Sequence, residues 1–355
     1  MFQGRGQVRP PIGIAFDGDF GNRLDALLAV AMLNGLTAKT EARRISLSVS
    51  RPSLVSAQIA DVVAAFYRGR PATGPGGGIG AASEGMIGMP EGAGAEDQKA
   101  PLAAILAKKG ADGAPAYTST VRGLVNTAES AVLIRNLLLA QHDGNAAIVL
   151  AGPATGLVRM LGLYRTGPQV SAKCRQLVVA AGAFPDGLPE PTIKADVAAA
   201  RKLFAEWPTP IVAVGAEVGA ALPYPGASID RDFAWAPVHP VVDAYRAIAP
   251  APADAPAAAL AATLFAVHPE TGDFKLSEPG TITVLDDGRT RFPPAADGRH
   301  RYLIADPARK EQLMAQYTAL VAAPPAPRPG RGRGATPAPA DAAADSADKS
   351  TESFT

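Results

Sequence analysis

The sequence predicts an α/β protein built on a mostly parallel sheet with helices on both faces. Short apolar segments recur along the chain without the alternation of half-exposed strands, which is typical of strands covered on both sides. Segments with the apolar spacing of helices lie between them, joined by short links. The chain has 355 residues, of which 47% are hydrophobic, so it is long enough to bury a large core.

The individual elements follow from this pattern in chain order. Strands are predicted at 12–16, 44–50, 146–152, 176–182 and 210–218, where isoleucine, valine, leucine and alanine gather. Helices are predicted at 23–35, 53–68, 125–141, 155–163, 195–206 and 256–267. Residues 280–292 are predicted to form a C-terminal β-hairpin that turns at Asp287-Gly288, because Asp-Gly suits a tight hairpin turn.

The alternating pattern extends over residues 11–322, where we expect a single α/β domain. Residues 323–355 are rich in proline, alanine and glycine, and we expect a disordered tail because such a segment buries too little apolar surface to offset its ordering entropy. Limited proteolysis should therefore trim the tail and leave a stable core. A second protease-resistant unit from residue 323 onward would contradict this division.

One glycine-rich segment interrupts the alternation, at residues 70–98. It is too long for an ordinary connection, and two interpretations stay open: a lid over a binding site, or a disordered insert. Its "GPGGGIG" is not a phosphate-binding loop, because no Lys-Ser or Lys-Thr follows.

Composition argues against several classes of function. The net charge is +1 with no basic block in the apolar body, which argues against a nucleic-acid partner. No apolar run reaches the roughly 20 residues of a membrane helix, and the first residues lack the apolar segment of a signal peptide, so the compartment stays open. Cys174 is the only cysteine, which excludes an intrachain disulfide and a cysteine-rich zinc site.

Three aspartates follow the first predicted strand, in "FDGDFGNRLD" (16–25). Ligands of open α/β sheets bind at the carboxyl ends of the strands, where Asp17, Asp19 and Asp25 fall. The alternative is structural: Asp17 and Asp25 as helix caps, and Asp19 as a turn residue. Three carboxylates within nine residues favour a ligand site, and oxygen atoms of this kind suit a hard cation.

The segment "FDGDFGNRLDALLAVAML" resembles the signature of the inosine-uridine-preferring nucleoside hydrolase family, D-x-D-x-G-N-x-x-D-D-A-L-A-L. Two later blocks agree in order and spacing. "AAIVLAGPATGLVRML" (146–161) resembles the family's strand, G-P-L-T-N and helix, and "LVVAAGAFPDGLPEPTIKADVAAARKLFAEWPTPIVAVGAEV" (177–218) resembles its G-G-A-F region and the helix that follows. The resemblance covers roughly residues 11–320.

The resemblance implies a nucleoside hydrolase-like fold and a calcium-dependent N-ribohydrolase, which breaks a ribosyl N-glycosidic bond with an activated water. By position, Asp19 would bind Ca²⁺ and accept the proton of the water. Asp17 and the backbone carbonyl of Ala151 would complete the metal ligands. The substrate would be bound by the following residues: Asn22, Asp25, Glu190 and Thr192.

The sequence departs from the family at two expected calcium ligands, which are Ala26 and Ala259 here. Because charged ligands set calcium affinity, Ca²⁺ is the cofactor that the resemblance implies but one that this chain has possibly lost. We expect both alanines at the hydrated mouth of the sheet, where restored aspartates would recover calcium affinity. The family's G-P-L-T-N asparagine is replaced by Gly156, and another of its asparagines by Thr192.

Two functions therefore stay open. The first is an active N-glycosidase of the nucleoside hydrolase kind. The second is a non-catalytic, calcium-less relative that binds a nucleoside or sugar. Either function has a small-molecule ligand, and the resemblance also implies a possible homo-oligomer.

Overall fold

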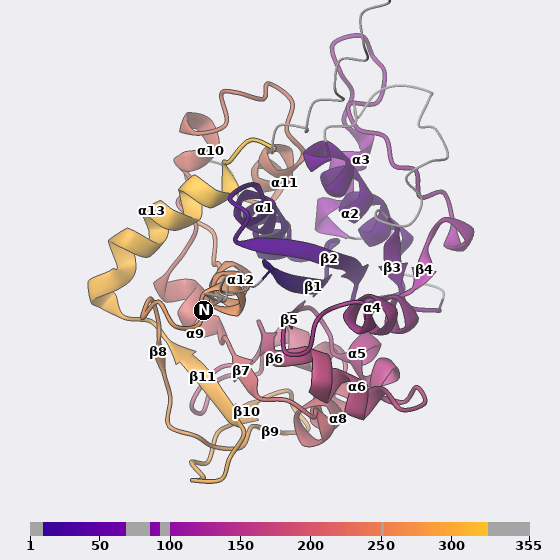
Figure 1. Cartoon of the computed structure of the whole chain (residues 1–355). Coiled ribbons are helices and arrows are strands. Elements are labelled where there is room, and N and C mark those ends of the chain that lie inside the picture. The colour runs from indigo at the N-terminus through magenta and orange to yellow at the C-terminus, as the bar shows by residue number, and fades with distance from the viewer. Residues whose placement is uncertain (1–9, 69–85, 93–99, 250–251, 326–355) are drawn as a thin grey trace, which may run out of the picture.

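The structure is a computed structural model and describes residues 10–68, 86–92, 100–249 and 252–325. These residues contain a nine-stranded sheet with the order β4-β3-β2-β1-β5-β6-β7-β11-β8 (Figure 1). All neighbouring strands are parallel except β8, which is antiparallel to β11. The predicted mostly parallel sheet is thus confirmed. The strands are β1 (Ile12–Gly18), β2 (Ala42–Val49), β3 (Ile87–Met89), β4 (Ala128–Glu129), β5 (Ala146–Ala151), β6 (Cys174–Val179), β7 (Ile211–Ala213), β8 (Lys275–Leu276) and β11 (His300–Ile304).

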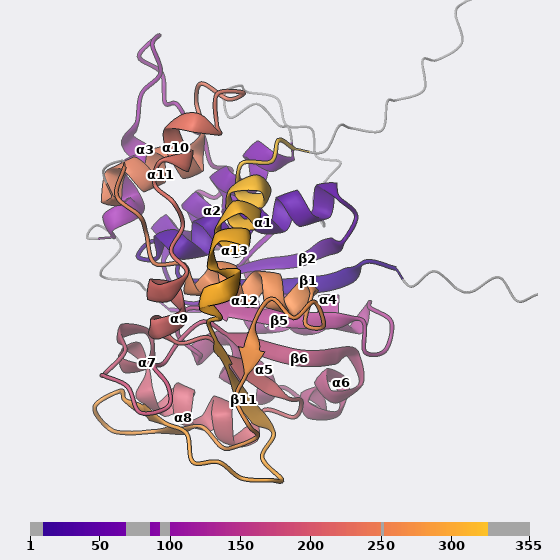
Figure 2. The same ribbon diagram turned by 90° about the vertical axis from the view of Figure 1, so that its left-hand side faces the viewer.

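Helices cover both faces of the sheet, as predicted. Successive side chains of β1 point to opposite faces, so Ile14 and Phe16 enter one core and Ala15 the other. The first core is closed by α1 (Leu24–Ala38), α2 (Leu54–Tyr67), α11 (Pro240–Ile248), α12 (Ala258–Val267) and α13 (Lys310–Val321). The second is closed by α4 (Ser130–Leu139), α5 (Thr155–Leu161), α6 (Thr166–Lys173) and α8 (Val197–Glu206). In Figure 2, α1, α2 and α13 lie on one side of the strands, and α5, α6 and α8 lie on the other.

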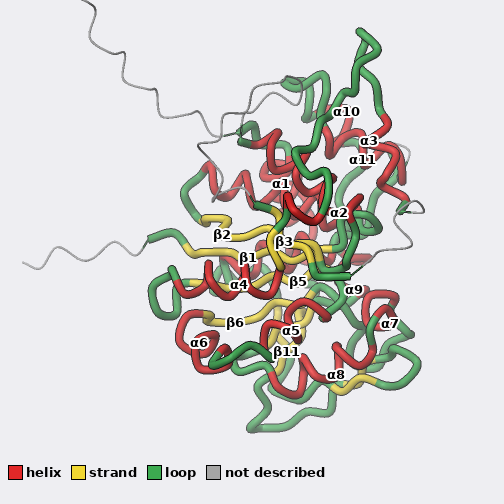
Figure 3. The backbone as a smooth tube through the Cα atoms, turned by 90° about the vertical axis from the view of Figure 1, so that its right-hand side faces the viewer, coloured by secondary structure: helices red, strands yellow, loops and turns green. Residues whose placement is uncertain are grey.

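The strand order places a topological switch point between β1 and β5. The chain proceeds from β1 outward through β2, β3 and β4 and then returns to β5 on the other side of β1. Figure 3 shows β2, β1, β5 and β6 side by side in this order. Gly18 at the end of β1 pairs with Ala151 at the end of β5. Loops leaving these two strands diverge, and the resulting crevice is the usual ligand site of such sheets.

Several predicted elements need correction. The run 210–218 is not one strand: β7 ends at Ala213, and α9 (Ala216–Ala221) begins after Gly215, because a buried helix and a buried strand have the same apolar composition. The predicted helix 125–141 is shorter, since Glu129 caps α4 with its side chain and β4 precedes it. The predicted helix 195–206 exists as α8 but begins two residues later, because Asp196 caps α8 and Ala195 ends the short α7 (Pro191–Ala195).

Other elements lay outside the sequence prediction. They include α6, α11 and α13, the short helices α3 (Ala104–Ala107) and α10 (Ser228–Arg231), and the edge strands β4 and β8. The predicted hairpin exists, as β9 (Thr283–Val284) paired with β10 (Thr290–Arg291), and its turn residue Gly288 has a φ of +85°. None of the described helices is long and apolar enough to cross a membrane.

The glycine-rich segment 70–98 contains one element that was not expected. Strand β3 lies within it and pairs in parallel with β2 through Leu47 and Ile87. The lid and insert interpretations were made for 70–98, of which residues 70–85 and 93–98 lie outside the described residues, as does the predicted tail from residue 326 onward.

Candidate functional site

Asp17 lies inside the sheet rather than on an open surface. Its side chain is 0% exposed, and Oδ1 accepts a hydrogen bond of 2.9 Å from Ser48 Oγ on β2. Oδ2 has no hydrogen-bond partner among the described residues. Burial raises the pKa of Asp17 to about 7, the Ser48 hydrogen bond opposes this rise, and the charge of Asp19 adds to it. Asp17 is therefore a buried carboxyl group whose one ordered contact is to the neighbouring strand.

Asp19 follows β1 and is neutralised by the chain itself. Its carboxylate accepts a hydrogen bond of 2.8 Å from Asn22 Nδ2 and one of 2.6 Å from Arg51 Nε, and the residue is 2% exposed. Its backbone N–H donates to the Ala151 carbonyl at 3.1 Å. The carbonyl that the resemblance implied as a metal ligand thus already accepts a hydrogen bond.

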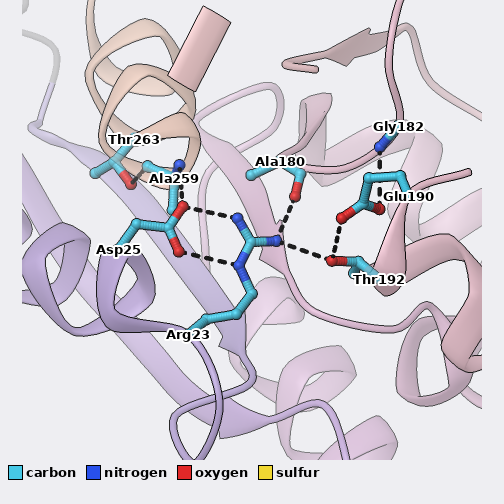
Figure 4. Close-up of polar contacts among 8 residues, drawn as sticks. All are labelled: Arg23, Asp25, Ala180, Gly182, Glu190, Thr192, Ala259 and Thr263. Carbon is cyan, nitrogen blue, oxygen red and sulfur yellow. Dashed lines mark hydrogen bonds and ion pairs between the residues drawn. The ribbon is translucent and has the colours of Figure 1, made fainter. Parts of the chain in front are cut away.

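Arg23 connects the next group of polar residues (Figure 4). Its Nε and Nη2 donate to the two oxygens of Asp25 at 3.0 and 2.7 Å. Its Nη1 donates to the Ala180 carbonyl at 2.6 Å and to Thr192 Oγ1 at 3.2 Å. Burial alone would lower the pKa of Arg23, but the charge and hydrogen bonds of Asp25, with Glu190 and Asp19 nearby, raise it overall. The guanidinium is therefore charged at any physiological pH.

Two carboxylates extend this network on either side of Arg23. Asp25 Oδ2 also accepts a hydrogen bond of 2.9 Å from the backbone N–H of Ala259 at the start of α12, where the helix dipole favours a negative charge. Glu190 Oε1 accepts a hydrogen bond of 2.8 Å from Thr192 Oγ1, and Oε2 accepts hydrogen bonds from the backbone N–H groups of Ile193 and Gly182. Glu190 is thus the cap of α7.

The structure brings Asp25, Glu190 and Thr192, three of the four residues predicted to bind substrate, into one hydrogen-bonded group. Asp19 and Asn22 form a neighbouring pair. Sequence reasoning missed Arg23, which joins the first three. The available signal was a basic residue directly before a predicted helix and two positions from a motif aspartate.

A pocket of about 630 Å³ adjoins this network. One wall is polar and includes Asn22, Arg23, Asp25, Glu190 and Thr192. The rest is mostly small or apolar and comprises Leu24, Ala180, Ala181, Gly182, Pro191, Val214, Ala216, Gly219, Ala220, Ile248, Ala249, Asp254, Ala255, Pro256 and Ala258. This volume lies within the range of small-molecule pockets, about 300–1,000 Å³.

The residues present do not fit a calcium ion. Ala26 and Ala259 are 0% exposed and lie in the core, so the expectation that they occupy a hydrated mouth is wrong. They lie in the first turns of α1 and α12, two helices that pack against each other. Both carboxylate oxygens of Asp25 and both of Asp19 already accept hydrogen bonds. Within the described residues, no three His, Cys, Asp or Glu side chains are grouped to hold a metal.

Comparison with known proteins places this site in a known fold. No protein-family model and no curated protein matches the chain. Among solved structures, an inosine-uridine preferring nucleoside hydrolase from Bacillus anthracis aligns with 15% identity and a TM-score of 0.61, covering 88% of this chain and 99% of that one. A purine-preferring ribonucleoside hydrolase from Gardnerella vaginalis aligns with 16% identity and a TM-score of 0.63, covering 87% of this chain and 98% of that one.

The third comparison is the type III effector protein XopQ, solved in complex with adenosine diphosphate ribose. It aligns with 14% identity and a TM-score of 0.61, covering 88% of this chain and 94% of that one. The chain thus has the α/β fold of the nucleoside hydrolases, as the motifs predicted.

Proposed function

We propose that this protein binds a nucleoside-like ribosyl compound, without calcium, in the pocket beside Arg23. The observation that carries the proposal is a polar wall whose two carboxylates are held by groups of the chain itself, Asp25 by the Arg23 guanidinium and Glu190 by hydroxyl and backbone N–H donors. Asp25, Glu190 and Thr192 are held in fixed positions by Arg23 and by backbone N–H groups. Such a wall can accept hydrogen bonds from sugar hydroxyls, while the apolar remainder can receive a base.

The similar solved structures support this ligand class. Two are nucleoside hydrolases, and one is an effector protein in complex with adenosine diphosphate ribose. The proposal extends their shared chemistry, a ribosyl group, to this chain.

Hydrolysis of an N-ribosyl bond is the second candidate, favoured by the fold and by Asp19 at the carboxyl end of β1. In this mechanism Asp19 would take the proton of the attacking water, and the ribosyl group would develop oxocarbenium character. Arg51 and Asn22 already occupy both oxygens of Asp19, and a metal that would acidify the water does not fit. Binding is therefore the better supported function.

The experiment measures binding and turnover together. Inosine, uridine, guanosine and adenosine diphosphate ribose are titrated by calorimetry, in EDTA and in CaCl₂, while base release is followed by chromatography. We expect binding of at least one compound in EDTA and no release of base. Glu190→Gln should weaken binding by about tenfold or more, because a charge-assisted hydrogen bond is lost. The exposed Glu206→Gln is the control, and calcium-dependent base release would instead identify a hydrolase.

Asp19→Ala separates the two functions further. If the protein releases base, this change should abolish release, because Asp19 is the proposed proton acceptor. Thermal stability should change by only a few degrees, since Arg51, the freed partner, is 37% exposed and can be hydrated. A collapse of stability without any effect on a measured activity would show that Asp19 is a structural turn residue.

A further inference from the structure

The guanidinium of Arg23 lies among four oxygen atoms that come from distant parts of the chain. Two belong to Asp25, one is the carbonyl of Ala180 after β6, and one is the hydroxyl of Thr192 in α7. Figure 4 shows all four contacts converging on one side chain. A set of carboxylate, carbonyl and hydroxyl oxygens is also what a hard cation receives from a protein.

The surrounding charges make this position a cation site. Asp25 contacts the guanidinium, and Glu190 and Asp19 are close enough to favour its charged form. The Arg23 side chain is 18% exposed and that of Asp25 is 10% exposed, so solvent screens these charges weakly. Without a cation, the carboxylate of Asp25 would be left buried with only the Ala259 N–H to stabilise it.

From this arrangement we infer that the guanidinium of Arg23 takes the place of a bound metal ion at this site. It supplies the positive charge that holds the surrounding carboxylate, carbonyl and hydroxyl oxygens in position. It ties the start of α1 to the end of β6 and to α7, and it holds the polar wall of the pocket without any added ion. The inference concerns the protein alone and does not depend on the identity of the ligand.

The shape of arginine is required for this role. Its planar fork directs Nε and Nη2 to one carboxylate and Nη1 to two other oxygens at the same time. Lysine carries the same charge on a single nitrogen and cannot make all four contacts. Arg23→Lys should therefore keep part of the stabilisation, and Arg23→Ala should lose all of it.

The test is cation rescue measured by thermal unfolding of the full chain, without nucleoside. Arg23→Ala should lower the melting temperature by about 5 °C or more, and Arg23→Lys by less. About 50 mM guanidinium chloride should restore part of the loss in Arg23→Ala, because the freed oxygens bind the ion and ligands that bind only the native state stabilise it. Millimolar CaCl₂ should raise the melting temperature of Arg23→Ala and leave the parent unchanged, with NaCl at equal ionic strength as the reference.

The matched control is Arg246→Ala, which also removes an arginine from a carboxylate, that of Asp230, but in a pair whose two side chains are both exposed. Neither cation should raise its melting temperature. The inference is overturned if neither guanidinium nor calcium stabilises Arg23→Ala. If Arg23→Ala does not fold, the same titrations are carried out on Arg23→Lys and on the parent. Micromolar calcium binding by the parent would refute the inference. A melting temperature of Arg23→Lys equal to that of the parent would refute it as well.

Discussion

Replacing Ala26 and Ala259 together by aspartate is expected to destabilise the protein by several kcal/mol, and calcium is not expected to reverse the effect. Both alanines are wholly buried in the core, in the first turns of α1 and α12, two helices that pack against each other. Each new carboxylate would lose its hydration, at a cost of several kcal/mol unless it is protonated or paired. The cation nearest the motif, Arg23, is already bound to Asp25. The measurement is urea unfolding with and without CaCl₂.

The control for this double variant is Ala198→Asp. Ala198 is the second residue of α8, as Ala259 is of α12, but it is exposed. Its carboxylate gains the same favourable helix dipole without desolvation, so stability should change by no more than about 0.5 kcal/mol. Near-parental stability of the double variant, or a large calcium-dependent rise in its melting temperature, would restore the view that these positions belong to a metal site.

Asp17→Asn is expected to stabilise the protein at pH 8 and to have little effect near pH 4. Burial raises the pKa of Asp17 to about 7, whereas an unfolded aspartate titrates near about 3.9. The folded state therefore keeps a proton that the unfolded state has lost, and stability falls as pH rises from about 4 to 7. At about 1.4 kcal/mol per pH unit, the loss amounts to at most about 4 kcal/mol. Asparagine can still accept the Ser48 hydrogen bond but cannot ionise.

The measurement is the free energy of unfolding in urea at several pH values between 4 and 8.5. The exposed Asp286→Asn serves as the control and should not change the slope. A pH profile of Asp17→Asn parallel to that of the parent would show that Asp17 is ionised in the folded state. Asp17 Oδ2, which has no hydrogen-bond partner among the described residues, would then have to be hydrated.

Much of the fold was determined by local patterns in the sequence. The strand predicted at 12–16 is seven residues of continuous burial, and such runs are stable only between two covering layers. The run at 210–218 was misread because composition does not distinguish a buried strand from a buried helix. Helices α11 and α13 carry mixed faces whose burial depends on partners remote in the sequence.

The site divides in the same way. The sequence by itself placed carboxylates at the end of the first strand, where ligands of such sheets bind. The resemblance to the nucleoside hydrolases implied that Asp25, Glu190 and Thr192 contact one substrate, and the structure joins them in one hydrogen-bonded group. Only the tertiary structure decided which cation neutralises them. Arg23 bonds to groups 157 and 169 positions away. Ala26 and Ala259 are inaccessible to solvent because α1 and α12, which are distant in the sequence, pack against each other. The spacing of Arg23 and Asp25 is local in the chain, but desolvation and the remaining contacts of Arg23 depend on distances in space that no local pattern encodes.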